Sequence, residues 1–244
     1  MRSKELPLEK YDSDKVANCR MDKYDRILES WIHKPIVLLE LGIYKGGSLL
    51  LWNDYFPSGT IVGVDVVLPK EFKATDRIKI FEGSQTDPQF LSRMANEVAP
   101  SGFDIIIDDA SHLGEWTRIA FWHLFDNHLK PGGLYVIEDW GTGYWDDWAD
   151  GKSLDLQTYN QPPQRKPEPW WRKLIGKKNE KEKLPFPCHS YGMVGFVKQL
   201  IDEQGAGDAT IEKLTGKSKR NSKFKEMFIA PGLVFVKKND TICE

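Results

Sequence analysis

Two apolar runs that each end in acidic residues constrain the fold of this chain more than any other feature. The first is Phe103–Asp108, followed directly by Asp109 and, three residues later, by His112. The second is Gly133–Asp139, whose last two residues are Glu and Asp. Such runs are typical of buried parallel strands, and open α/β sheets bind ligands at the carboxyl ends of their strands. The sequence therefore predicts that several carboxylates and one imidazole meet at one edge of a sheet.

The two runs belong to a regular alternation of apolar strands and helical segments. Five strands separated by helices predict a Rossmann-like, doubly wound and mostly parallel sheet. A closing pair across Pro231–Gly232 adds an antiparallel C-terminal strand, which gives a seven-stranded sheet. The expected strands are Ile36–Gly42, Thr60–Asp65, Arg77–Ser84, Phe103–Asp108, Gly133–Asp139, Met227–Ala230 and Leu233–Lys237, with another short strand at Ala209–Leu214. The expected helices are a covering helix or helix pair over Ser13–His33, then Leu49–Tyr55, a helix opened by Asp87 and Pro88, Glu115–His128 and Gly192–Glu203.

Two segments fall outside this alternation. Residues 1–13 are polar and predict a loose arm, which with the following helical segment makes an N-terminal unit over residues 1–35. Residues 36–244 then form the main domain. Within it, residues 140–190 lack a sustained apolar period, and an insertion of this length in a compact domain is usually a functional lid or disordered.

Charge, cysteine content and hydropathy narrow the class of protein. Lys and Arg number 34 against 36 Asp and Glu, so the net charge of −2 provides no field for gripping a phosphate backbone, and nucleic acid is not an expected partner. Three widely spaced cysteines argue against a disulfide framework or a zinc knuckle. No signal-peptide pattern and no run near the ~18 apolar residues of a membrane span is present. We expect a soluble cytoplasmic protein.

A glycine-rich loop follows the first predicted strand. It reads Glu40-Leu-Gly-Ile-Tyr-Lys-Gly-Gly-Ser48, which differs from the dinucleotide fingerprint but still lets a ligand approach the backbone. Alone, such a loop is about as often a tight strand-to-helix turn. Asp65 ends the next strand 23 residues after Gly42, near the ~20-residue interval at which an acid can bind both ribose hydroxyls. Ser84 and Gln85 follow the third strand at the same edge, so this half of the sheet is predicted to bind a nucleoside.

Together these motifs resemble those of class I S-adenosylmethionine-dependent methyltransferases. Within that class they look like the metal-dependent sugar O-methyltransferases of macrolide biosynthesis and their relatives that act on bacterial saccharides. The resemblance covers roughly residues 36–145. It implies a magnesium-dependent enzyme that methylates a sugar hydroxyl of a glycoside, oligosaccharide or glycosylated natural product. The stretches that carry it are Leu-Glu-Leu-Gly42 with Gly-Gly-Ser48 and Trp52, Gly83-Ser-Gln, Asp108-Asp-Ala-Ser-His112 and Lys130-Pro-Gly-Gly-Leu-Tyr-Val-Ile-Glu-Asp139.

The resemblance also implies roles for individual residues. Asp109, Glu138 and Asp139 correspond to the metal-binding acids of the family, and three carboxylates with open positions suit a hard cation such as Mg²⁺. His112 corresponds to the general base of the family, and Asp109 is expected to be catalytic as well as metal-binding. A lone histidine at a strand end is more often structural, but the joint match of the motifs favours catalysis. The expected cofactor-binding residues are Glu40, Gly42, Gly46, Ser48, Asp65, Ser84, Gln85 and Asp108, although Asp108 could instead stiffen its loop.

Several alternatives remain open from the sequence. A catechol-type O-methyltransferase would have the same fold, but that group places Asp-Asn at the Glu138-Asp139 positions and tends to use a lysine base. A non-catalytic nucleotide-binding module would bind a nucleotide without a metal. The segment Trp170–Lys178 could belong to a lid, which we prefer, or rest on an anionic membrane that presents a lipid-linked glycan. The expected partner is a sugar-bearing acceptor, and the chain could form a homo-oligomer.

Overall fold

A computed structural model describes residues 2–145, 147–153 and 190–240 of the chain. Within these residues a seven-stranded sheet has the order β3-β2-β1-β4-β5-β7-β6, and β7 runs antiparallel to both of its neighbours. The predicted fold class is therefore confirmed. The strands are β1 (Val37–Leu41), β2 (Thr60–Asp65), β3 (Ile78–Glu82), β4 (Phe103–Asp108), β5 (Leu129–Glu138), β6 (Phe224–Ala230) and β7 (Leu233–Lys238).

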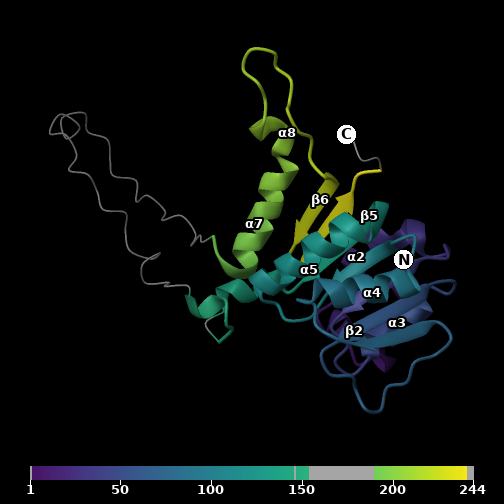
Figure 1. The fold of residues 1–244 in the computed structure, drawn as a ribbon. Coiled ribbons are helices and arrows are strands. Elements are labelled where there is room, and N and C mark those ends of the chain that lie inside the picture. The colour runs from purple at the N-terminus through teal and green to yellow at the C-terminus, as the bar shows by residue number, and fades with distance from the viewer. Residues whose placement is uncertain (1, 146, 154–189, 241–244) are drawn as a thin grey trace, which may run out of the picture.

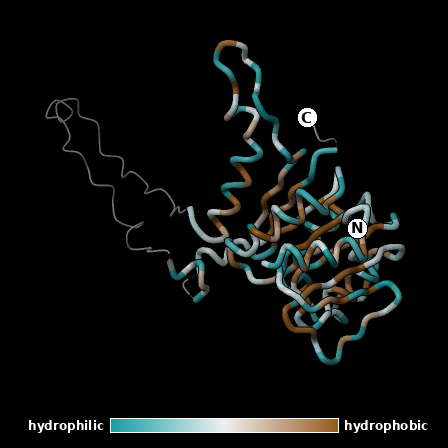
Figure 2. Tube along the Cα trace, in the orientation of Figure 1, coloured by the Kyte–Doolittle hydropathy of each residue, from teal (hydrophilic) through white to brown (hydrophobic). Residues whose placement is uncertain are grey.

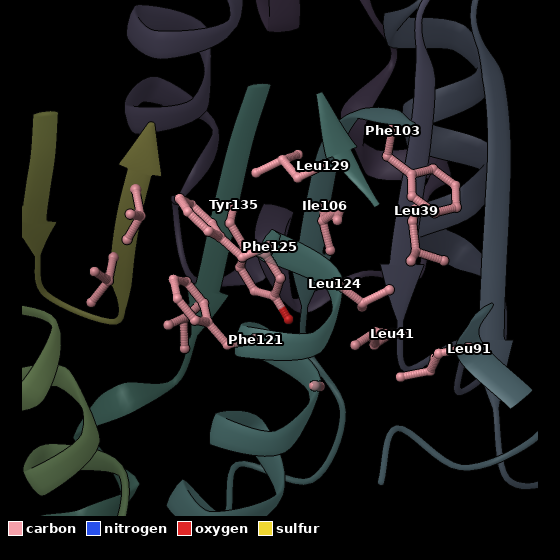
Figure 3. Close-up of a cluster of buried hydrophobic side chains, with 14 of the residues drawn as sticks. Leu39, Leu41, Leu91, Phe103, Ile106, Phe121, Leu124, Phe125, Leu129 and Tyr135 are labelled. Carbon is pink, nitrogen blue, oxygen red and sulfur yellow. The ribbon is translucent and has the colours of Figure 1, made fainter. Parts of the chain in front are cut away.

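Helices cover both faces of the sheet (Figure 1). On one face α4 (Pro88–Val98), α5 (Gly114–Asn127) and α7 (Gly192–Gln204) enclose a core that Figure 3 shows, with Phe121, Leu124 and Phe125 packed on strand residues such as Ile106 and Tyr135. The opposite face is covered by α2 (Met21–Leu28) and α3 (Gly47–Tyr55). Alternate residues of a strand point to opposite faces, so both faces of these apolar strands are buried. Figure 2 accordingly shows hydrophobic colour along the central strands.

A local sequence signal sets the start of α4 as predicted. The Asp87 side chain accepts hydrogen bonds from the backbone N–H groups of Gln89 and Phe90, both at 3.0 Å, and Pro88 is the first residue of α4. This combination of an acidic cap with a first-turn proline stabilises a helix N-terminus. The predicted helical segment at Ser13–His33 is a helix pair, formed by α1 (Asp14–Ala17) and α2 with the 3-10 turn η3 (Glu29–Trp31).

The prediction of a loose arm at residues 1–13 is wrong. The segment forms two 3-10 turns, η1 (Arg2–Glu5) and η2 (Leu8–Lys10), and packs against α2 and α3. The backbone N–H and the hydroxyl of Ser3 donate to the buried Asp25 carboxylate at 3.0 and 2.6 Å. Its polar residues therefore serve as hydrogen-bond partners for a buried acid, which composition alone does not reveal.

Two other expectations are changed by the structure. The strand predicted at Ala209–Leu214 is wrong: α8 (Ala206–Ala209) is followed by one isolated bridge between Ile211 and Ser218, and Leu214 is fully exposed. The hairpin that this bridge closes projects away from the sheet (Figure 1). Its apolar residues Ile211 and Leu214 are therefore exposed. The start of the insertion is regular, with η4 (Trp140–Tyr144) and η5 (Gly151–Ser153).

The remainder of the insertion, including Trp170–Lys178, lies outside the described residues. The division into residues 1–35 and 36–244 stays a prediction. In the part of the chain that the structure describes, no helix has the length and apolar character needed to span a membrane.

Candidate functional site

A cavity of about 760 Å³ lies at the carboxyl ends of β1, β2, β3 and β4. Its lining includes seven of the predicted cofactor or catalytic residues, together with a segment that the sequence analysis did not connect with the site. The predicted residues are Gly42, Ser48, Asp65, Ser84, Gln85 and the Asp109–His112 stretch; the unexpected ones are Asp12, Ser13, Asp14 and Ala17 of the N-terminal segment.

The glycine loop is held tightly between β1 and its neighbours. Gly42 has φ +95°, and a Cβ placed on it would lie 2.2 Å from the carbonyl oxygen of Asp109, so the approach of the β1 and β4 ends requires glycine. The Asp65 carboxylate at the end of β2 accepts the N–H groups of Ile43 at 2.8 Å and Tyr44 at 3.1 Å. Asp65 thus fixes the loop while also lining the cavity.

Three predicted cofactor residues do not line this cavity: Glu40, Gly46 and Asp108. Glu40 is fully buried on the α3 side, where it accepts hydrogen bonds from Ser48 Oγ at 2.7 Å and Trp52 Nε1 at 3.3 Å. Gly46, with φ +87°, is the residue before α3.

Asp108 is also buried, and Gln85 Nε2 and Tyr135 Oη donate to it at 3.3 and 3.4 Å. Burial raises the pKa of Asp108 to about 7. Glu40 and Asp108 therefore support the loops around the cavity from opposite faces of the sheet, since strand alternation directs them to different sides.

His112 faces two carboxylates, of which Asp109 lines the cavity while Asp139, like Glu138, lies outside its lining. Its Nε2 lies 3.9 Å from Asp109 Oδ1 and 3.9 Å from Asp139 Oδ2, and one ligand atom from each of the three residues lies within 4.8 Å of the others. His112 and Asp139 have φ of +52° and +51°, a region that non-glycine residues rarely adopt and that recurs at functional sites. Burial lowers the pKa of His112 despite the opposing charge of Asp139. The imidazole is therefore neutral near pH 7 and can accept a proton.

A buried lysine lies behind these groups. The Lys15 side chain is fully buried, and its Nζ contacts Asp109 Oδ2 at 2.6 Å, Glu40 Oε1 at 2.9 Å and Glu138 Oε1 at 3.0 Å. Burial alone would lower the pKa of Lys15, but the three carboxylates outweigh it and hold that pKa well above its usual value. Lys15 is therefore a permanent cation inside the site.

Glu138 is enclosed by cations and a phenol. Its Oε1 accepts the hydroxyl of Tyr24 at 2.6 Å in addition to Lys15, and its Oε2 accepts Arg20 Nη1 at 2.5 Å. Arg20 also donates to Asp139. Burial opposes ionisation of Glu138, but Lys15 and Arg20 lower its pKa, whereas burial and the charge of Glu138 raise the pKa of Asp109 well above the usual range.

The three acids predicted to bind one metal ion, Asp109, Glu138 and Asp139, fall into two overlapping groups of ligand atoms. Asp109 joins His112 and Asp139 in one set of converging ligand atoms, and joins Asp14 and Glu138 in a second. The carboxylate oxygens are hard donors of the kind Mg²⁺ prefers. The acids also outnumber the cations, since five carboxyl groups face two cations; because burial raises the pKa of Asp109 and of Glu40, full ionisation of the five acids is favoured only beside a further cation. The acids are Asp14, Glu40, Asp109, Glu138 and Asp139, and the cations are Lys15 and Arg20.

Sequence reasoning missed the contribution of the N-terminal segment. Lys15, Arg20 and Tyr24 precede the first strand, and a charged helical segment is usually a solvated face. The one available signal was Ser13, a cap residue whose side chain accepts the N–H of Lys15 and so marks a helix start. Nothing in that signal reveals that Lys15 points inward.

Aromatic side chains border the same site. Trp148 Nε1 and Thr142 Oγ1 each donate to the carbonyl oxygen of His112 at 3.2 Å, which ties the start of the insertion to the histidine loop. Trp116 lines the cavity and is 47% exposed. An exposed indole in the same cavity lining as His112 offers an apolar platform for a ring-shaped ligand.

Comparison with known proteins gives a consistent set of relatives, although no protein-family model matches the chain. It is 34% identical over 207 residues to the mycinamicin VI 2''-O-methyltransferase of Micromonospora griseorubida, covering 75% of this chain and 48% of that enzyme. It is 48% identical over 119 residues to the 8-demethyl-8-(2-methoxy-alpha-L-rhamnosyl)-tetracenomycin-C 3'-O-methyltransferase of Streptomyces olivaceus, covering 46% of this chain and 30% of that enzyme.

A solved structure agrees with these relatives. The MycE methyltransferase in complex with Mg, SAH and mycinamycin VI matches with a TM-score of 0.61 and 28% identity. The match covers 89% of this chain and 49% of MycE. The chain thus spans about half the length of the mycinamicin relatives that it matches, and a smaller part of the tetracenomycin enzyme.

Proposed function

We propose that this chain, a homologue of the sugar O-methyltransferases of macrolide and tetracenomycin glycosides with their class I methyltransferase fold, transfers the methyl group of S-adenosylmethionine to a sugar hydroxyl. The observation that carries the proposal is the meeting of His112, Asp109 and Asp139, because the first two of these residues line a cavity that is also lined by the glycine loop and Asp65. One end supports a nucleoside, and the other supports proton removal beside hard metal ligands.

The cofactor end of the cavity has groups suited to S-adenosylmethionine. The carboxylate of Asp65 would accept the ribose hydroxyls, and Ser84 with Gln85 would border the adenine. Gln85 is fixed for this role because its Oε1 accepts the N–H of Ser111 at 3.1 Å and its Nε2 donates to Asp108. The loop at Gly42 lets the cofactor approach the backbone between the ends of β1 and β4.

The chemical step is an in-line displacement. The acceptor oxygen forms a bond to the methyl carbon, the carbon–sulfur bond of the sulfonium breaks, and the hydroxyl proton passes to Nε2 of His112. The products are the methyl ether and S-adenosylhomocysteine. His112 suits the base role because its pKa is lowered by burial, and Trp148 and Thr142 fix its backbone. Most of the remaining catalysis is positioning.

Asp109 and Asp139 are the acids with an oxygen directed toward His112, and Asp14 and Glu138 complete the second ligand group. We propose that Mg²⁺ is held by Asp109 and Asp139, with Glu138 or Asp14 in support. A bound divalent cation would orient the acceptor and lower the pKa of its hydroxyl. This assignment is supported by the converging carboxylate oxygens of the cluster and by the Mg in the MycE complex.

A sugar is the acceptor class that the site favours. The relatives named above are 2''-O- and 3'-O-methyltransferases of glycosides. In this chain the exposed Trp116 lines the same cavity as His112, and sugar rings stack on aromatic faces through their C–H surfaces. The identity of the sugar, a cytoplasmic location and a homo-oligomer stay predictions.

The proposal is tested by incubating the purified chain with labelled S-adenosylmethionine, Mg²⁺ and a panel of glycosides, their aglycones and a catechol. Label should enter glycosides and not aglycones, and EDTA should abolish transfer. Methylation of the catechol alone would favour the catechol-type alternative. Tight NAD binding without any transfer would favour a nucleotide-binding module.

Replacement of the base provides a residue-level arm of the same experiment. His112→Gln should lower kcat by a factor of about 10² or more, because general-base catalysis contributes about that much, while S-adenosylhomocysteine affinity is retained. The matched control is His123→Gln, since His123 Nε2 lies 2.9 Å from Ser92 Oγ and does not line the cavity. Normal turnover in His112→Gln would remove it as the base.

A further inference from the structure

Lys15 is a fully buried cation of the site that the proposed reaction does not use. It belongs to α1, a four-residue helix capped by Ser13, and its side chain has no solvent exposure. A charge so buried is stable only when carboxylates compensate it. Its three close partners come from three different strand ends, namely Glu40 of β1, Asp109 after β4 and Glu138 of β5.

The contacts of Lys15 determine which carboxylate oxygens of Asp109 and Glu138 remain available to a metal ion. Asp109 receives the ammonium group on Oδ2, so its Oδ1 is left facing His112 at 3.9 Å. Glu138 receives it on Oε1. Glu40, which lies outside the cavity lining, receives it at 2.9 Å and is held in turn by Ser48 at 2.7 Å. Lys15 therefore connects an acid of the glycine-loop strand with two acids of the proposed metal site.

We propose that Lys15 is a positioning residue and fixed counter-charge for the metal site, holding Asp109 with one oxygen toward His112 and limiting how strongly the carboxylates attract a divalent cation. The inference rests on the proposed function, because it assumes that Asp109 and Glu138 take part in metal binding. It assigns to the N-terminal segment a direct part in shaping the site.

The proposal makes opposite predictions for two neighbouring charges. Lys15→Met removes a positive charge and should tighten Mn²⁺ binding by about tenfold, because a like charge a few ångströms from the cation is lost. Glu40→Gln removes a negative charge that compensates Lys15, and it should weaken Mn²⁺ binding by a similar factor. Turnover should fall at least tenfold in Lys15→Met, since Asp109 is no longer held. Affinity for S-adenosylhomocysteine should change less than about twofold, because Lys15 does not line the cavity.

The experiment is a titration of the purified full chain with Mn²⁺, read by electron paramagnetic resonance in the absence of cofactor and acceptor. Circular dichroism and thermal unfolding are recorded for every variant. The matched control is Lys45→Met, because Lys45 also binds the N-terminal segment, through Asp12 at 3.0 Å, but is 61% exposed. Mn²⁺ affinity should be unchanged in that control.

Weaker or unchanged Mn²⁺ binding in a folded Lys15→Met chain would overturn the proposal, as would equal losses in Lys15→Met and Glu40→Gln. Should Lys15→Met not fold, Lys15→Gln answers the same question, since it keeps hydrogen-bond donors and removes only the charge. Absence of Mn²⁺ binding by the wild type would instead contradict the metal role in the proposed function. The two failures are therefore distinguishable.

Discussion

At the scale of single residues, strand alternation separates the two acids that close β4. Asp108 points to the face covered by α4, α5 and α7, where Tyr135 and Gln85 donate to it. Asp109 follows the strand and lines the cavity. Burial raises the pKa of Asp108 to about 7, so this carboxyl is protonated in a mildly acidic solution while it still accepts hydrogen bonds. Asp108 and Asp109 are adjacent in the sequence, but Asp108 is a buried hydrogen-bond acceptor and Asp109 faces the cavity.

The variant Asp108→Asn tests this difference through stability. The pKa of Asp108 rises from 3.8 in the unfolded chain to about 7 in the folded chain, so its contribution is full below pH 4 and is lost as the pH rises through 7. Between pH 5 and pH 8 the wild type should therefore lose roughly 3 kcal/mol of unfolding free energy that the variant keeps. Urea unfolding at both pH values measures this, with the exposed Asp22→Asn as control. The same pH dependence in Asp108→Asn and wild type would contradict it.

At the scale of elements, Asp150 ties the start of the insertion to two helices. Its Oδ2 accepts the N–H of Gly114, the first residue of α5, at 2.8 Å and the N–H of Met193 in the first turn of α7 at 2.7 Å. A carboxylate is favoured there by the partial positive charge of both helix N-termini. A Cβ on Gly114 would lie 2.1 Å from the backbone of Gly192, so the two helix starts are in direct contact.

Asp150→Ala should therefore lower the free energy of unfolding by about 2 kcal/mol, because two helix N–H groups lose their acceptor. Turnover should also fall, since Trp148, two residues earlier, donates to the His112 carbonyl. Urea unfolding and kcat are the measurements. Asp147→Ala, in the same segment but exposed, is the matched control and should leave both unchanged. Unaltered stability in Asp150→Ala would show that the two helix starts do not depend on this cap.

The same elements show which parts of the structure could be predicted from the sequence. The strands β1, β4 and β5 were predicted because an uninterrupted apolar run has few alternatives to a buried strand. The helices within Ser13–His33 were predicted, but the part of Lys15 in the site was not, because the partners that bury it, Asp109 and Glu138, lie about a hundred residues away. Local pattern cannot distinguish such a lysine from a solvated one. The side of the site built from strand ends was thus predictable, and the side built from residues 12–20 was not.

At the scale of the whole molecule, the N-terminal segment and four strand ends close one cavity. Residues Asp12–Asp14 line it from one side, and Gly42, Ser84 and Asp109 line it from the strand ends. In contrast, no described residue of β6 or β7 contributes to the lining. Ligand binding should therefore stabilise two regions that are distant in sequence, and leave the antiparallel edge of the sheet unchanged.

Hydrogen–deuterium exchange with and without S-adenosylhomocysteine and Mg²⁺ tests this arrangement. At a ligand concentration 100 times Kd, amides that open only with ligand release gain about 2.7 kcal/mol of protection, or roughly a hundredfold slower exchange. That gain is expected for residues 12–17, 42–48, 83–85 and 109–112. The matched reference region is β6–β7, where exchange should stay the same because these strands lie outside the cavity lining. Protection confined to residues 42–48 and 83–85 would show that the cofactor binds without the N-terminal segment, and that Lys15 and its neighbours do not close the site.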